Sequence, residues 1–383
     1  MTQSQIPQKR KGRGTSKKVD LCLLFVLGCL LAFGMAVLVS CTGYMDAKEH
    51  PASPFYTVSR QAVFLAAALG VMAAVSRIDY HKLIKLSRVM YPAAIGLGIL
   101  VLFFGKEVNG QKRWFAVGPV SFQPAEFAKL TLILVLSDFF DRHYDRLNTM
   151  KQVWLAALLT LPVFLPVVEA NLSSGLILAG IAFFMTFAVS GKRSIIGAMA
   201  CAGIAACVAA YQSGLLAAVL DEYQMNRIYA WIDPEQFPLS NGFQVLQGLY
   251  AIGAGGLFGV GLGNSLQKLG YLPEAQNDMI FSIICEELGL AGALLLMALF
   301  VLLIWRFLVI AVHAPDDVGM FLTIGVMSHI ALQVLLNIAV VTNTIPNTGV
   351  SLPFISYGGS SLLFLLTEIG IVLRVSTGAN EVQ

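Results

Sequence analysis

The stretch Leu272–Gly289, LPEAQNDMIFSIICEELG, decides how this chain folds, because it leads into an apolar run from Met279 to Ile304. A helix of that length crosses a membrane, given about 1.5 Å per residue and about 30 Å of hydrocarbon. Only Glu286 and Glu287 interrupt the run. Ionised groups are costly in a membrane, so these carboxylates are candidates for function.

Asp278 comes directly before the apolar run, where we expect the membrane–water boundary. Burial there should raise the pKa of its carboxyl toward a value that suits a general base at neutral pH. Glu274 lies four residues earlier, and Glu286 returns to within about 80° of the Asp278 face at about 100° per residue. The competing interpretation is that Asn277 or Asp278 only caps the helix.

Composition sets the class of protein. The chain has 383 residues, of which 57% are hydrophobic and 12% charged, and its mean hydropathy is +0.75. These values predict an all-α polytopic membrane protein. The net charge of +3 and the scattered basic residues exclude a nucleic-acid-binding stripe. The six cysteines form no CxxC pair, which argues against a disulfide framework and a metal site.

Ten apolar runs predict about ten transmembrane helices within a single domain, 19–376. We expect a disordered basic tail at 1–18, a short tail at 377–383, and a long external loop at 212–277. Of the 25 basic residues, 17 fall on one side of this arrangement, which predicts that both termini are cytoplasmic. The runs are Leu21–Val39, Val58–Val75, Val89–Gly105, Ala125–Phe140, Val153–Val168, Leu172–Ser190, Ser194–Tyr211, Met279–Ile304, Val318–Val341 and Ser360–Leu373.

Three loops carry further signals. Asn109–Leu130 contains Arg113 and feeds Glu126 and Lys129 into a helix at a spacing that allows an ion pair. On spacing alone, the pair is favoured as structural, with Arg113 reaching toward lipid headgroups. Gly248–Gly263 has seven glycines but no Walker lysine, which favours close-packed re-entrant segments over a phosphate-binding nest. Thr342–Leu363 is rich in turn-forming residues and is expected to line a cavity near Asp278.

Three strings, in this order, resemble the SEDS family (shape, elongation, division and sporulation), which includes FtsW, RodA and SpoVE. They are NGQKRWFAVGPVSFQPAEFAKL, GGLFGVGLGNSLQKLGYLPEAQNDMIF with its EELG extension, and SLPFISYGGSSLL. The chain looks closest to the FtsW and SpoVE branch. It departs from the family where Gln276-Asn277 replaces a usual His-Thr pair, and where Glu169–Gly175 lacks the Pro and Asp of an EPDLGTA-like motif.

The resemblance implies a peptidoglycan glycosyltransferase that polymerises lipid II at the outer face of the bacterial cytoplasmic membrane, with a class B penicillin-binding protein as partner. Asp278 would then be the base that deprotonates the acceptor sugar hydroxyl. A divalent cation, Mg²⁺ or Mn²⁺, could help offset the pyrophosphate charge, with Asp278 as its one protein ligand. The substrate-binding candidates are Arg113, Glu126, Lys129, Glu274, Glu286, Ser356, Tyr357, Ser360 and Ser361.

Two other functions remain open at this point. A lipid II flippase would also need polar groups in a helical bundle, but it would need them throughout the membrane depth. A scaffold that recruits the penicillin-binding protein would need no catalytic base. The gathering of polar residues at one face favours the enzyme.

Overall fold

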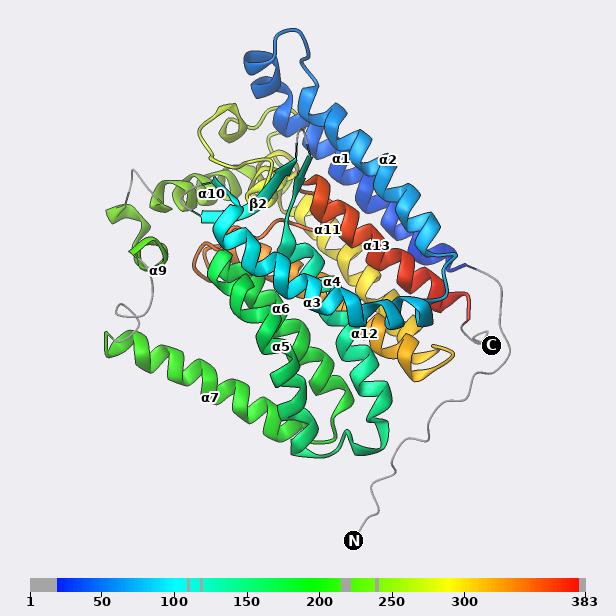
Figure 1. The fold of residues 1–383 in the computed structure, drawn as a ribbon. Coiled ribbons are helices and arrows are strands. Elements are labelled where there is room, and N and C mark those ends of the chain that lie inside the picture. The colour runs from blue at the N-terminus through cyan, green and yellow to red at the C-terminus, as the bar shows by residue number, and fades with distance from the viewer. Residues whose placement is uncertain (1–18, 109–110, 118–119, 215–221, 238–240, 379–383) are drawn as a thin grey trace.

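The computed structural model describes residues 19–108, 111–117, 120–214, 222–237 and 241–378. The predicted tail at 1–18 and residues 379–383 lie outside this part of the chain. Within it, long helices pack side by side, and the beginning of α1 lies at the same end of the bundle as the end of α13 (Figure 1). The helices are α1 (Leu21–Glu49), α2 (Tyr56–Val75), α3 (Tyr80–Phe104), α4 (Pro124–Arg142), α5 (Met150–Ala170), α6 (Leu172–Val189), α7 (Arg193–Gln212), α9 (Glu222–Ile232), α10 (Asn241–Gly255), α11 (Ile280–Val312), α12 (Asp317–Val341) and α13 (Gly359–Ser376).

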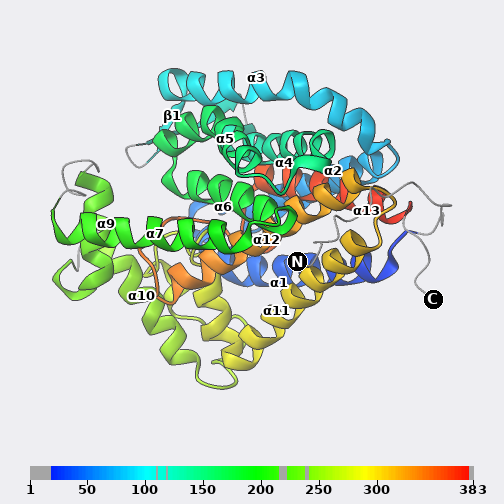
Figure 2. The same cartoon turned by 90° about the horizontal axis from the view of Figure 1, so that it is seen from below.

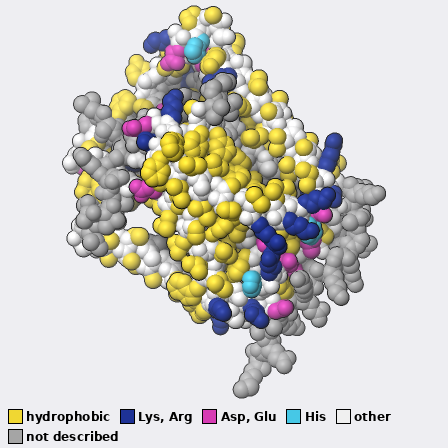
Figure 3. Space-filling model, in the orientation of Figure 1, with side chains coloured by type: hydrophobic (Ala, Val, Ile, Leu, Met, Phe, Trp, Pro, Cys, Tyr) yellow, Lys and Arg dark blue, Asp and Glu magenta, His cyan; other side chains and the backbone are white. Residues whose placement is uncertain are grey.

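Nine helices in the described part of the chain are long and apolar enough to cross a membrane. They correspond to nine of the ten predicted runs, and a broad apolar band covers the visible face of the bundle (Figure 3). The remaining run, Ala125–Phe140, lies in α4, which has 19 residues but carries charged side chains at both ends.

Helix α4 nevertheless runs from one end of the bundle to the other. Phe127, near its start, contacts Phe364 at the start of α13, with ring centroids 6.2 Å apart. Phe140, near its end, contacts Phe321 at the start of α12, at 5.8 Å. The starts of α12 and α13 lie at opposite ends because these helices are consecutive and antiparallel. Most of α4 is buried by neighbouring helices, so Glu126 and Lys129 meet protein instead of lipid.

The loop between α3 and α4 forms a small antiparallel sheet, which the sequence interpretation did not include. Its strands are β1 (Lys106–Val108), β2 (Gln111–Val117) and β3 (Val120–Phe122), in that order. Glu107 pairs with Lys112, and Phe115 with Phe122. The sheet holds β2, and with it Arg113, over the end of α5.

The glycine-rich segment is close-packed, as predicted, and the helix that it contacts is α11. Helix α11 is broken at Gly289, whose φ of 66° and ψ of −166° lie outside the helical region. The loop after α10 fills this break: Val260 and Gly261 donate to the carbonyls of Glu286 and Glu287 at 2.9 and 3.0 Å. A Cβ on Gly289 would lie 2.4 Å from the Gly259 nitrogen, so a side chain has no room there.

Candidate functional site

The Asp278 carboxylate lies in the turn before α11 and does not cap that helix. Met279 occupies the N-cap position, and no side chain makes a capping hydrogen bond there. Asp278 instead accepts a long hydrogen bond, 3.4 Å, from the Gln244 side chain of α10. Its backbone carbonyl accepts one from Asn337 of α12 at 2.7 Å. The helix-cap interpretation is therefore wrong, and two other helices fix the position of this residue.

The electrostatic environment of Asp278 favours its protonated form. Its exposed fraction is only 9%. Burial, followed by the nearby charge of Glu274, raises the pKa of the Asp278 carboxyl from 3.8 to about 7. The charge of Arg227 and the hydrogen bond from Gln244 act in the opposite direction. A carboxyl with this pKa exchanges protons readily at neutral pH, as a general base must.

The loop between α12 and α13 closes over Asp278. Asn337 also donates to the Val350 carbonyl at 2.7 Å, so one amide joins this loop to the Asp278 turn. Asn347 donates to the Gln244 side chain at 2.9 Å. Gly349 has a φ of +70°, and a Cβ there would lie 3.5 Å from an Asp278 carboxylate oxygen. The stretch 342–363 thus lies near Asp278, as predicted.

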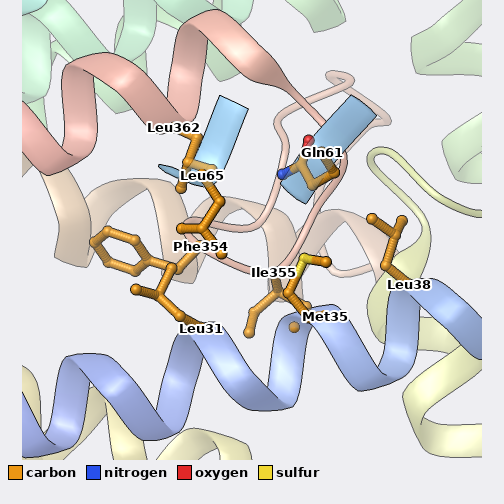
Figure 4. Close-up of a pocket in the computed structure, with 9 residues that line it drawn as sticks. Leu31, Met35, Leu38, Gln61, Leu65, Phe354, Ile355 and Leu362 are labelled. Atoms are coloured by element: carbon orange, nitrogen blue, oxygen red, sulfur yellow. The ribbon is translucent and has the colours of Figure 1, made fainter. Parts of the chain in front are cut away.

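The far side of the same loop is held by α1 and α2 (Figure 4). Phe354 and Ile355 face Leu31 and Met35 of α1 across a cavity of only about 10 Å³. The buried Gln61 of α2 accepts a hydrogen bond from the Gly358 amide at 3.2 Å. The loop is therefore clamped on both sides, which keeps the Asp278 surroundings in place.

A cavity of about 370 Å³ lies beside this site. Its polar wall contains Arg113 of β2, Arg227 of α9 and Asn347, and the last of these connects the cavity to the Asp278–Gln244 pair. Its apolar wall includes Leu172 and Leu176 of α6. The complete lining is Gln111, Arg113, Glu169, Leu172, Ser173, Leu176, Gln224, Arg227, Ile228, Leu336, Ile345, Pro346, Asn347 and Thr348.

Two arginines bring positive charge to the cavity. Arg113, a predicted site residue, donates to the Ala170 carbonyl at 3.2 Å, and Arg227 donates to the Asn347 carbonyl at 3.1 Å. The sequence interpretation missed Arg227, because it stands in a long loop with no motif around it that spacing alone would single out. Its amphipathic helix, α9, was the available signal.

The structure separates other predicted residues from this cavity. Lys129 and Glu126 form the predicted ion pair at 2.8 Å, with side-chain exposures of 1% and 6%, inside the bundle. Glu286 accepts hydrogen bonds from Ser265 and from the Leu266 amide in the loop after α10. Glu286 therefore anchors that loop and does not line the cavity. The predicted angle of about 80° between Glu286 and Asp278 around the helix axis did not show this.

The remaining predicted residues surround the Asp278 turn. Ser356 donates to the Asn277 carbonyl, and the Tyr357 amide donates to the Gln276 carbonyl at 2.9 Å. Glu274 is exposed and accepts a hydrogen bond from Asn277. Its side chain acts on Asp278 through charge. Ser360 and Ser361 are half-buried in the first turn of α13.

The described residues do not form a cage for a resident metal ion, because no three His, Cys, Asp or Glu side chains converge among them. Around Asp278 the second carboxylate is Glu274, and the Gln244 amide oxygen is already engaged by Asn347. This donor set suits a cation whose other ligands come from a bound phosphate group.

Comparison with known proteins agrees with this architecture. The family model for FtsW, RodA and SpoVE, described as a cell cycle protein, matches residues 20–381. Stage V sporulation protein E of Bacillus subtilis (strain 168) is 37% identical over 369 residues, which cover 94% of this chain and 98% of that protein. A probable peptidoglycan glycosyltransferase FtsW of Trichlorobacter lovleyi is 35% identical over 364 residues, covering 94% and 93%.

Solved structures show the same fold. A chain from a peptidoglycan synthase complex, studied for its coordination of polymerization and crosslinking, superposes with a TM-score of 0.75 at 30% identity, covering 94% of this chain and 97% of that one. The rod shape-determining protein RodA of Thermus thermophilus gives a TM-score of 0.66 at 27% identity, covering 95% and 98%. The chain therefore belongs to the FtsW, RodA and SpoVE family of multi-pass membrane proteins.

Proposed function

We propose that this chain is a peptidoglycan glycosyltransferase that joins the disaccharide units of lipid II into glycan strands. One observation carries the proposal: a buried carboxylate with a pKa near 7, Asp278, stands behind a cavity whose polar wall contains Arg113 and Arg227. A base and a cradle of positive charge are the two elements that this transfer needs. The names of the relatives support the same activity.

The reaction can be written with this chain's own residues. The Asp278 carboxylate takes the proton from the acceptor sugar hydroxyl, and the resulting oxygen forms a bond to the anomeric carbon of the donor. The bond between that carbon and the pyrophosphate oxygen breaks, and the pyrophosphate leaves with the electron pair. Arg113 and Arg227 offset its charge, and a guanidinium can contact two phosphate oxygens at once.

The shape of the cavity suits a lipid-linked substrate. Leu172 and Leu176 of α6 and Leu336 of α12 form an apolar wall beside the arginines. An isoprenoid chain on that wall would leave the pyrophosphate near the guanidinium groups. A divalent cation, if one is used, would be held mainly by the phosphate oxygens of the substrate, with Asp278 as the candidate protein ligand, and would supply additional charge neutralisation.

We further propose that the site faces the outside of the bacterial cytoplasmic membrane, with both termini in the cytoplasm, because 17 of the 25 basic residues of the sequence fall in segments predicted to be cytoplasmic. An activity reporter that works only outside the cytoplasm should be active when inserted after Ser213 and silent after Gln383. The reverse pattern would overturn this orientation. The partner we propose is a class B penicillin-binding protein, consistent with the synthase complex among the structural neighbours.

The direct test is to incubate purified protein with lipid II, with and without a penicillin-binding protein, and to separate the glycan strands on a gel. We expect strands that lengthen with time. A preparation that forms none, while it moves labelled lipid II between leaflets of a vesicle, would show a flippase. A preparation that does neither, but still binds the penicillin-binding protein, would show a scaffold.

A further inference from the structure

The loop after α10 presents a group of large apolar side chains that the proposed reaction does not use. Leu257, Phe258, Val260 and Leu262 are 64%, 83%, 43% and 60% exposed. We call residues 257–262 the apolar tip. The chain contains no charged residue and no histidine from Gln236 to Gln267, so no ionisable group in this stretch opposes contact with a lipid surface.

The apolar tip has a fixed shape. Gly259 and Gly261 have φ values of +78° and +97°, which L side chains rarely adopt. The amides of Leu290 and Ala291 donate to the carbonyls of Gly256 and Leu257 at 2.9 and 3.0 Å. Together with the bonds from 260 and 261 to α11, these contacts tie both sides of the tip to the break in that helix. The exposed side chains are therefore held outward on a rigid base.

Two polar contacts between α1 and α11 locate the tip along the membrane normal. At one end, Arg306 pairs with Asp20 at 2.7 Å. At the other, Lys268 pairs with Glu287 at 2.6 Å, and Ser40 donates to the same carboxylate at 2.7 Å. The 16 helical steps from Leu290, just after the break in α11, to Arg306 span about 24 Å, most of the hydrocarbon thickness of about 30 Å, and Glu287 lies before the break.

No charged residue lies on α11 between Glu287 and Arg306. Leu290, Leu294 and Leu295, which follow Glu287 within about two turns, are at least half exposed. The apolar tip is bonded to α11 at the level of Glu286 to Ala291. It therefore continues the lipid-facing surface of α11 at the edge of the hydrocarbon layer. Figure 2 shows α10 and the loop that follows it beside the first turns of α11, at the periphery of the bundle.

We propose that the apolar tip inserts into the membrane leaflet nearest Asp278 and anchors α10 to the lipid. Helix α10 then connects this anchor to the site, because Gln244 donates to Asp278 and Gly248 packs against the Met279 and Ser282 side chains. The tip is thus a lipid-binding surface that supports the position of Gln244. This inference stands whether or not the chain is a glycosyltransferase.

Tryptophan fluorescence in proteoliposomes of phosphatidylethanolamine and phosphatidylglycerol tests the proposal. In Phe258→Trp, the emission added to that of the four native tryptophans should be quenched by lipids brominated in the upper acyl chain and protected from aqueous iodide. Leu262→Trp serves as a second reporter if the first variant does not fold. Tyr271→Trp is the matched control, because Tyr271 is 59% exposed in the same loop but lies near the exposed Glu274. Its added emission should be quenched by iodide.

Iodide quenching of the tip reporters, with no effect of brominated lipids, would overturn the proposal. The same holds if the reporters become protected only when a penicillin-binding protein is added, since the tip would then be a protein-docking surface.

Discussion

Replacing Asp278 by asparagine should make the protein more stable while removing its base. The pKa of this carboxyl is about 7 in the folded protein and 3.8 for an ordinary aspartate, so the folded state holds the proton more tightly than the unfolded state does. Stability from this group is fully present below pH 4 and is lost as pH rises through about 7. Asparagine cannot ionise, so Asp278→Asn escapes that loss.

The size of the effect follows from the same values. Each tenfold change in proton concentration between the two pKa values costs about 1.4 kcal/mol, so on the order of 4 kcal/mol separates pH 4 from pH 8 as an upper bound. Between pH 5 and pH 8 the stability advantage of Asp278→Asn over wild type should grow by about 2–3 kcal/mol. Titrating groups that do not interact with Asp278 behave alike in the two proteins, so their contributions cancel.

Thermal unfolding of both proteins in detergent at pH 5, 6, 7 and 8 measures this difference. We expect the variant to unfold at a higher temperature, with a gap that widens with pH. Glu274→Gln should narrow the gap, because the charge of Glu274 contributes to the raised pKa of Asp278. A gap that stays constant with pH would refute the claim that Asp278 titrates near neutrality.

Three further predictions concern other parts of the site and the bundle. Lys129→Met should cost about 3–5 kcal/mol, since it leaves the Glu126 carboxyl buried without its ion-pair partner, and adding Glu126→Gln should restore folded protein in detergent; equal losses in single and double variants would contradict the pairing. His329→Leu should cost about 1–3 kcal/mol, because it leaves Glu368, its fully buried partner at 2.8 Å, without that hydrogen bond, and Glu368→Leu on top of it should recover most of the loss in the same unfolding assay. Arg227→Ala should lower glycan synthesis about tenfold or more with little loss of stability, and Arg227→Lys should lower it less; unchanged rates in both would remove Arg227 from the site.

Hydropathy predicted the architecture well, because membrane helices are specified by long apolar runs that need no tertiary information. Nine predicted runs correspond to helices that meet the length and hydropathy of a span. The tenth, α4, was recognised by its apolar content, although only burial explains how Glu126 and Lys129 are accommodated there. Helix ends were less accurate, since α1 continues to Glu49, ten residues beyond the predicted run.

The site was only partly predictable, for a different physical reason. Asp278 stood out because it directly precedes an apolar run. A carboxylate at such a boundary can be recognised from the sequence without any tertiary information. Arg227 and Asn347 enter the site through contacts between segments more than 100 residues apart, which spacing does not encode. Glu286 was wrongly predicted to lie in the site because an angle around the helix axis gives the direction of a side chain but not what packs against it. In the structure the loop after α10 packs there and binds Glu286.

The most direct test of the central claim is the rate of glycan formation by Asp278→Asn in a purified assay supplemented with the penicillin-binding protein. We predict that the variant still inserts in the membrane and binds lipid II, and that its rate falls by a factor of about 10² or more, because the amide cannot accept the acceptor proton. Asp278→Glu should retain little activity, since one methylene displaces the base by about an ångström. Polymerisation by Asp278→Asn at a rate close to that of wild type would show that Asp278 is not the base.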